Sequence, residues 1–229
     1  MTIAPILLAW PLAFGQNVEE TNFVDLPIQE IENNSELREL EYQAFKTGEK
    51  LTYVVHYGFV NAGEAVVELQ ETKKEVNGRK MLHAVGTGRS LGAFNWFYKV
   101  NDRYETYFDE EGVFPWMFIR RVNEGGFKIN QDYTFFQHKQ KVKTEEDEEF
   151  EVTPHIQDML SSFYFARTMD FSKAEIGDTY TFDCFLDEEI FPLRMKYLGV
   201  EEVELRKGKY RCMKFVPVVQ EGRIFEKSE

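Results

Sequence analysis

The stretch LTYVVHYGFVNAGEAVVEL, residues 51–69, places a histidine and a carboxylate near each other. His56 precedes Glu64 across an expected tight turn at residues 61–63, and an imidazole that meets a carboxylate can transfer protons. Acid–base catalysis also needs a pocket and a group that orients the base. Because water competes for Glu64 at a turn, we favour a β-hairpin with a polar rim over a catalytic pair.

A second candidate for chemistry is the pair of carboxylates in VNDRYETYFD. Asp102 and Glu105 suit a glycoside hydrolase if they flank one cleft about 5 to 9 Å apart. Ser161 and Ser162 are weaker candidates, because no G-x-S-x-G elbow presents either hydroxyl as a nucleophile. A hydrolase that uses Asp102 or Glu105 therefore remains the alternative function.

The remaining histidines and the two cysteines do not form a recognisable site. His83, His138 and His155 lie on separate segments, and none has the i, i+2 or i, i+4 spacing that presents two ligands to a metal. We expect neither a metal nor a cofactor. For Cys184 and Cys212 we favour separate buried thiols over a disulfide, because a bridge needs Cβ vectors that converge.

The aromatic stretch GRSLGAFNWFYKVNDRYETYFD, residues 88–109, is the strongest candidate for binding. Its aromatic side chains can line a hydrophobic ligand groove, with a basic group at the rim to meet a phosphate or carboxylate head group. The alternative is an aromatic sheet core with snorkelling basic residues. The candidate ligand-binding residues are Phe94, Trp96, Tyr98, Arg103 and Tyr104.

Composition narrows the partners. The 229 residues include 21 Phe and 11 Tyr, rings that suit pleated sheets and apolar sites. With 27 basic and 40 acidic residues the net charge is −13, which argues against nucleic acid and against anionic membrane surfaces as partners. A lipid or another hydrophobic small molecule remains the expected ligand.

The N-terminal segment MTIAPILLAWPLAFG, residues 1–15, resembles a secretory signal. It is apolar and ends with small residues at Ala13 and Gly15, so we predict cleavage before Gln16. The run is too short for a transmembrane helix. We expect an exported protein whose residues 16–45 form a mobile polar leader.

The elements that must position these residues are mostly strands. From Phe45 onward, apolar and polar residues alternate, which predicts one β-rich domain over residues 46–229. Turns are expected at Asn77–Gly78 and Gly125–Gly126, among others. We therefore expect a mainly β protein, with a minor α+β component, built on a curved antiparallel sheet or half-barrel.

One segment predicts a helix. In TPHIQDMLSSFYFART, over residues 153–167, Thr153 is a suitable N-cap and Pro154 a suitable first helical residue. The apolar spacing predicts docking on the sheet through Met159, Leu160 and Phe163. Asp158 and Arg167 do not face each other along one helix, so each needs a partner on the sheet.

These motifs together resemble an exported bacterial family, domain of unknown function 3108. The resemblance runs from about Phe45 to the C-terminus and rests on GEKLTYVVHYGFVNAGEA, VNDRYETYFDEEGVFPWMFIRRVNEGG and IQDMLSSFYFAR. It implies a periplasmic or envelope protein with a curved half-barrel, similar in outline to lipoprotein carriers. Members continue with a further hairpin, so a chain that ends at GRIFEKSE is expected to be a fragment. The motif residues are Asp102, Tyr107, Asp158, Ser161, Tyr164 and Arg167.

The sequence thus predicts a non-enzymatic binding or scaffold module of the cell envelope with a hydrophobic, lipid-like ligand. The alternative is a hydrolase acting on envelope glycan or lipid.

Overall fold

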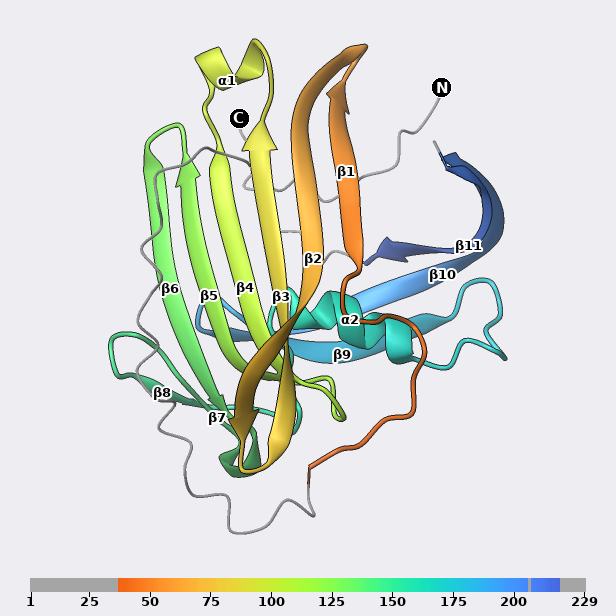
Figure 1. Cartoon of the computed structure of the whole chain (residues 1–229). Helices are drawn as coiled ribbons and strands as arrows, with labels where there is room; N and C mark the ends of the chain where they lie inside the picture. Colours follow the sequence, from red (N-terminus) through yellow and green to blue (C-terminus); the bar gives the residue numbers. More distant parts are fainter. Residues whose placement is uncertain (1–36, 206, 219–229) are drawn as a thin grey trace. The chain divides into compact units, whose positions relative to one another are not determined.

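The alternating segments form two antiparallel sheets in a computed structural model of the chain, which describes residues 37–205 and 207–218 (Figure 1). The chain divides into two compact units, Met1–Thr168 and Met169–Glu229. The predicted signal segment, residues 1–15, lies outside the described residues. A single β-rich domain over residues 46–229 stays a prediction.

The first unit contains an eight-stranded sheet in which every strand pairs with its neighbour in the chain. This order makes a meander, and β1 and β8 are edges in the described residues, so the sheet does not close into a barrel. The mainly β, antiparallel fold predicted from the sequence is confirmed. The strands are β1 (Lys50–Tyr57), β2 (Val60–Val76), β3 (Arg79–Ser90), β4 (Asn101–Asp109), β5 (Pro115–Glu124), β6 (Phe127–Phe136), β7 (Lys141–Lys143) and β8 (Glu149–Glu151).

The turns lie mostly where the sequence places them. Asn77–Gly78 joins β2 to β3, and Gly125–Gly126 joins β5 to β6. The first hairpin differs, because it turns at Gly58–Phe59 rather than at residues 61–63. Gly58 takes a φ of +59°, which a glycine adopts without steric cost, and β2 can therefore begin at Val60.

The predicted helix over residues 153–167 is shorter and begins later, as α2 (Ser161–Thr168). Thr153 does not start it, since His155 has a φ of +56° and breaks any helical run there. Asp158 supplies the cap instead. Its Oδ1 accepts hydrogen bonds from the backbone N–H groups of Leu160 and Ser161, both at 2.7 Å.

The later start also changes which residues dock the helix. α2 lies across one face of the eight-stranded sheet, with Leu160 and Tyr164 at 1% and 0% exposure (Figure 1). Tyr164 stacks on Phe108 of β4 at 5.3 Å between ring centroids. Phe163, predicted to dock the helix, is only half-buried, because the cap at Asp158 turns the next position, Tyr164, toward the sheet.

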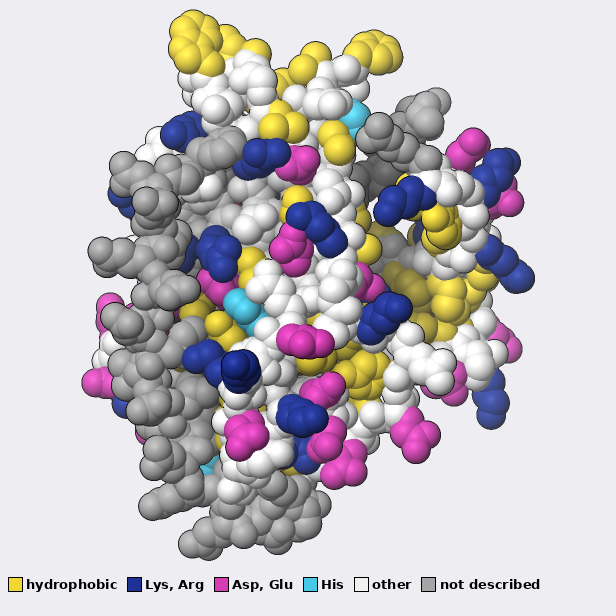
Figure 2. All heavy atoms as spheres, viewed as in Figure 1, with side chains coloured by type: hydrophobic (Ala, Val, Ile, Leu, Met, Phe, Trp, Pro, Cys, Tyr) yellow, Lys and Arg dark blue, Asp and Glu magenta, His cyan; other side chains and the backbone are white. Residues whose placement is uncertain are grey.

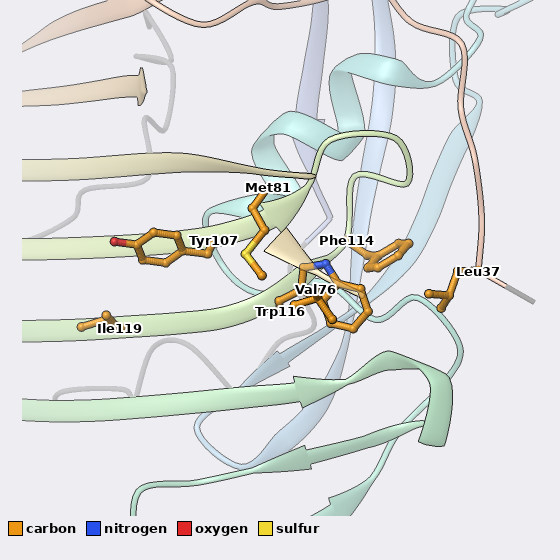
Figure 3. Close-up of a cluster of buried hydrophobic side chains, with 7 residues drawn as sticks. All are labelled: Leu37, Val76, Met81, Tyr107, Phe114, Trp116 and Ile119. Atoms are coloured by element: carbon orange, nitrogen blue, oxygen red, sulfur yellow. The ribbon is translucent and has the colours of Figure 1, made fainter. Parts of the chain in front are cut away.

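The opposite face of the sheet carries a second apolar cluster (Figure 3). Its side chains come from four strands, from the β4–β5 loop and from the segment before β1. Phe114 and Trp116 are fully buried, with ring centroids 5.3 Å apart at 75°. The members are Leu37, Val76, Met81, Tyr107, Phe114, Trp116 and Ile119.

The described end of the predicted leader, residues 37–45, packs on the first unit. Leu37 joins the cluster of Figure 3, and the Leu40 N–H donates to the carbonyl oxygen of Glu111 at 2.8 Å. Phe45 meets the Tyr164 ring edge-on at 4.9 Å. This part of the leader is therefore docked, and it forms no helical turn.

The second unit is a three-stranded antiparallel sheet in the order β11–β10–β9. Its strands are β9 (Thr179–Leu186), β10 (Glu189–Leu205) and β11 (Gly208–Pro217). Cys184 lies on β9 and Cys212 on β11, and no disulfide joins these two described residues. β10 separates them, so they are roughly two strand spacings, about 9.5 Å, apart at the least. This distance is too long for a disulfide, as the sequence indicated.

Candidate functional site

Three connections lie at the same end of the eight-stranded sheet, because alternate turns of a meander share an end (Figure 1). They are the β1–β2 turn, the β3–β4 connection with the short helix α1 (Phe94–Phe97), and the β5–β6 turn. Exposed hydrophobic side chains lie there, and Figure 2 shows two groups of them projecting from this end, one over α1 and one over the β1–β2 turn. We call this surface the aromatic end and define it as Tyr57, Phe59, Trp96, Phe97, Tyr98 and Phe127.

These six side chains are unusually open to solvent. Exposure ranges from 50% for Tyr98 to 107% for Phe59, with Trp96 at 83%. A single exposed ring on a protein surface is ordinary, whereas six at one end of one sheet form a patch of the kind that marks interaction sites. The patch needs a physical account, because open apolar surface in water is unfavourable.

The first two connections are joined to each other. The ring of Phe94 in α1 meets that of Tyr57 edge-on, with centroids 5.9 Å apart. The Leu91 N–H donates to the carbonyl oxygen of Ala62 at 2.8 Å. The aromatic residues of these connections are therefore held by neighbouring backbone.

Hydrogen bonds at its base hold the α1 connection. The Ser90 hydroxyl donates to Asn95 Oδ1 at 3.0 Å and accepts the Val100 N–H at 3.1 Å. The one-turn helix above them contains part of the Trp96–Phe97–Tyr98 run, in which successive residues lie about 100° apart around the axis. The three rings therefore point in different directions. Three consecutive residues of a strand could not do this, because strand side chains alternate between two sides.

The third connection is joined to the second through Tyr98. The Gly125 N–H donates to the Lys99 carbonyl oxygen at 2.9 Å, and the Tyr98 hydroxyl lies 3.4 Å from Glu124 Oε2. A Cβ at Gly125 would lie 2.5 Å from the Tyr98 ring, so only glycine allows this close approach. Each connection is thus linked to its neighbour by direct contacts.

Charge is distributed unevenly at this end. The three tips, residues 57–61, 91–99 and 125–128, contain no Asp or Glu, although the chain has 40 acidic residues. They carry Lys99 and Lys128, both exposed, and neither makes an ion pair within the described residues. The aromatic end is therefore locally basic on a strongly acidic chain.

Polar residues lie one step behind the tips, on the face that carries α2. Asp102 of β4 is 2% exposed, and its Oδ1 accepts the Asn123 N–H at 3.1 Å. Its Oδ2 has no hydrogen-bond partner among the described residues, and burial raises the pKa of this carboxyl to about 7. On the same face, the Arg120 guanidinium lies 6.0 Å from the centroid of the Tyr104 ring.

The predicted ligand-binding residues do not all lie together. Phe94, Trp96 and Tyr98 lie in or next to α1, whereas Tyr104 is 5% exposed on the strand below. Arg103 precedes Tyr104 on β4, so it points to the opposite face, where its Nε donates to Glu105 Oε1 at 2.6 Å. The structure therefore separates the predicted rim arginine from the buried tyrosine. Whether these residues line a groove stays a prediction.

The two candidate catalytic arrangements are also separated. Asp102 and Glu105 lie on opposite faces of β4, because their spacing is odd. Glu105 is bonded to His83 Nε2 at 2.7 Å and to Arg103, and these bonds lower its pKa to about 2 against the effect of burial. Neither feature suits a shared catalytic cleft.

The opening histidine–carboxylate pair is not formed either. Glu64 accepts the Arg89 Nε–H at 2.8 Å, and His56 is exposed opposite Asn61. The structure therefore contains the β-hairpin that the sequence favoured over a catalytic pair, but aromatic side chains, not polar ones, lie at its tip.

The motif residues of the helical segment are structural anchors. Asp158 Oδ2 accepts the Thr106 hydroxyl of β4 at 2.5 Å, and Arg167 makes two bonds to Glu49, at 2.6 and 2.7 Å. Each therefore has its own partner on or beside the sheet, as predicted. Tyr164 is buried between Phe45 and Phe108.

Ser161 and Tyr107 also have structural contacts. The Ser161 hydroxyl accepts the Asp158 N–H at 2.9 Å, which completes a reciprocal cap and occupies the hydroxyl. Tyr107 stacks on His83 on the other face of the sheet, with 4.1 Å between ring centroids.

Sequence reasoning missed Phe59 and Phe127, the aromatic residues of the two glycine turns. Each lies beside a glycine, in GF and GGF, and an aromatic ring at a turn tip cannot be buried by its own hairpin. That local signal indicates exposure, but only the meander shows that these tips meet α1.

The described residues contain neither a cluster of metal ligands nor a membrane-spanning helix. No group of three or more His, Cys, Asp or Glu side chains there could hold a metal ion. In the same residues, no helix is long and apolar enough to cross a membrane.

Comparison with known proteins identifies a family. Neither the curated proteins nor the solved structures contain a match to the chain. The model of a family described as a protein of unknown function (DUF3108) matches residues 52–229. This range contains both sheets, α1 and α2, and nearly all of the motifs on which the resemblance rests. The chain is a member of the family of domain of unknown function 3108.

Proposed function

We propose that this chain is an exported, non-enzymatic binding module of the cell envelope, and that it engages a hydrophobic, lipid-like ligand at the aromatic end. The observation that carries the proposal is the exposure of six apolar and aromatic side chains on three linked connections. Export is supported by the signal-like pattern of residues 1–15, which lie outside the described residues.

The aromatic end is suited to binding because its backbone is already ordered. Contacts between Phe94 and Tyr57, and between Tyr98 and Gly125, hold the connections together before any ligand arrives. A preformed site loses less conformational entropy on binding than a mobile one. An acyl chain that covers these rings removes apolar surface from water, at about 25 cal/mol for each Å².

The alternative hydrolase is supported less well. Its carboxylate pair, Asp102 and Glu105, would have to flank one cleft, and the two side chains lie on opposite faces of a strand. No other arrangement described above takes their place.

The proposal is tested with a monomeric ligand. Dodecanoate, kept below its micelle concentration, is titrated into the full chain, with tryptophan fluorescence and native mass spectrometry as readouts. We expect a bound adduct and a change in Trp96 emission, and Trp96→Ala should weaken binding. Tyr210→Ser removes a 44% exposed aromatic residue in the other unit and serves as the matched control. Apo protein alone at all concentrations would contradict the proposal.

A further inference from the structure

We propose that the aromatic end docks this protein onto the surface of a phospholipid bilayer, with its rings in the interface and Lys99 and Lys128 against headgroup phosphates. The inference extends the proposed function, because a module that exchanges a lipid-like ligand has to meet the membrane that holds it. The bilayer surface is a separate partner from the ligand, so each can be tested without the other.

The composition of the aromatic end is that of an interfacial anchor. Trp and Tyr concentrate where bilayers meet water, since each combines an apolar ring with a polar group. Trp96 and Tyr98 supply these rings, and Phe59, Phe97 and Phe127 supply fully apolar ones. All of them lie on turn tips, which project from the sheet and can enter the interface without unfolding a strand (Figures 1 and 2).

The local charge fits the same partner. Every phospholipid headgroup contains a phosphate, and the tips present Lys99 and Lys128 with no acidic residue among them. The first acidic residues behind the tips are Glu64, Asp102 and Glu124. Glu64 is bonded to Arg89, Asp102 is 2% exposed, and Glu124 lies 3.4 Å from the Tyr98 hydroxyl. Glu124 is therefore the one of these three carboxylates that is neither ion-paired nor buried, and the two tip lysines outnumber it.

The charge of the rest of the chain orients the docked protein. A net charge of −13 repels the molecule from an anionic surface in most orientations, and only an end without carboxylates can approach. The net charge of the chain argues against an anionic membrane as a partner, but it describes the molecule as a whole and not the tips, which contain no Asp or Glu.

A second copy of the chain fits the aromatic end less well. Two such ends packed together would bring four lysines close to one another, and neither tip set offers a carboxylate to pair with them. Like charges in contact are unfavourable, whereas headgroup phosphates neutralise the same lysines.

The experiment is co-sedimentation of the full chain with vesicles of phosphatidylcholine, alone or mixed with phosphatidylglycerol. The test variant is Phe59→Ser/Phe97→Ser/Phe127→Ser, which changes one exposed ring in each tip. Leu205→Ser/Tyr210→Ser is the control, because both residues are exposed at 56% and 44% on the other unit. All substituted side chains are exposed, so far-ultraviolet circular dichroism should not change.

We expect the wild type to sediment with both kinds of vesicle. The triple variant should bind at least about tenfold more weakly, because three rings no longer leave water for the bilayer interface on docking. Lys99→Glu/Lys128→Glu should weaken binding most on vesicles with phosphatidylglycerol. Trp96→Phe should still sediment but lose the blue shift of tryptophan emission that wild type shows on binding.

Three results would overturn the docking proposal: no sedimentation of the wild type, equal sedimentation of the triple variant, or a dimer in analytical ultracentrifugation that only the triple variant abolishes. Dodecanoate separates the two proposals. If dodecanoate binds and vesicles do not, docking fails and the proposed function stands. If vesicles bind and dodecanoate does not, the proposed function fails and docking stands.

Discussion

Replacing Asp158 by alanine tests whether the motif IQDMLSSFYFAR anchors α2 to the sheet. The carboxylate caps the N-terminus of the helical segment through the N–H groups of Leu160 and Ser161, and it accepts the Thr106 hydroxyl. Loss of an N-cap costs about 1 kcal/mol. Loss of a buried hydrogen bond to a carboxylate costs roughly 1.5 to 3 kcal/mol more. Thr106 keeps a bond of 3.3 Å to the Met117 carbonyl oxygen, so we take about 2 kcal/mol for this loss and expect about 3 kcal/mol in all.

The cost should depend on pH, because burial raises the pKa of Asp158 from 3.8 to about 6. A carboxyl whose pKa is raised in the folded state stabilises the fold fully below pH 3.8, and the contribution is lost as pH rises through 6. Between pH 5 and pH 8 the wild type therefore loses about 1.4 kcal/mol through this group. Asp158→Ala removes the group, so its cost should fall from about 3 kcal/mol at pH 5 to about 2 kcal/mol at pH 8.

The assay is urea unfolding at both pH values, followed by the fluorescence of Trp116, which is fully buried in the first unit. Asp158→Asn keeps the capping oxygen and should lose about 1 kcal/mol with little pH dependence. Asp170→Ala is the exposed control, because Asp170 accepts the Ser172 N–H at 2.8 Å at the surface and its loss should change stability little. A loss for Asp158→Ala no larger than that of Asp170→Ala would refute the anchoring role.

Three further substitutions have defined outcomes. Arg167→Lys breaks the half-buried, two-bond ion pair with Glu49 and should lower the free energy of unfolding in urea by about 2 kcal/mol. If a double-mutant cycle with Glu49→Gln gives no coupling energy, the ion pair is not the cause of that loss. Tyr164→Phe removes a buried hydroxyl without a partner among the described residues, so it should be neutral or stabilising by up to about 1 kcal/mol. Tyr164→Ala empties a buried aromatic site and should cost about 3 to 5 kcal/mol, which is more than Phe163→Ala costs. Because burial raises the pKa of Asp102 from 3.8 to about 7, the wild type should lose about 2.6 kcal/mol of stability through this group between pH 5 and pH 8, and Asp102→Asn should abolish that loss. An unchanged pH profile of thermal unfolding would contradict this.

The sequence predicted most of the sheet, because side-chain alternation and turn preferences depend only on residues that are close together in the chain. Alternation identifies strands, and the Asn77–Gly78 pair favours the turn that the structure contains. The start of the helix was wrong because Thr153 and Asp158 are both suitable caps by residue type. The choice between them depends on Thr106, a residue far away in the chain that bonds Asp158.

The aromatic end could be predicted only in part. Trp96 and Tyr98 were named as candidates because they lie in the aromatic stretch, but a one-turn helix has too few residues to show a helical period. Phe59 and Phe127 join α1 only because alternate turns of the meander meet at one end. Arg103 was assigned to the rim from proximity in sequence, whereas strand alternation places it on the other face from Tyr104.

The central claim is that the aromatic end is the surface through which this protein binds lipid-like ligands. Hydrogen–deuterium exchange of the full chain, with and without monomeric dodecanoate, tests it most directly because every tip is read separately. We predict slower exchange at residues 57–61, 91–99 and 125–128, and unchanged exchange in β9, β10 and β11. Protection confined to the second unit, or to the face of the first sheet that carries His83 and Glu105, would contradict the claim.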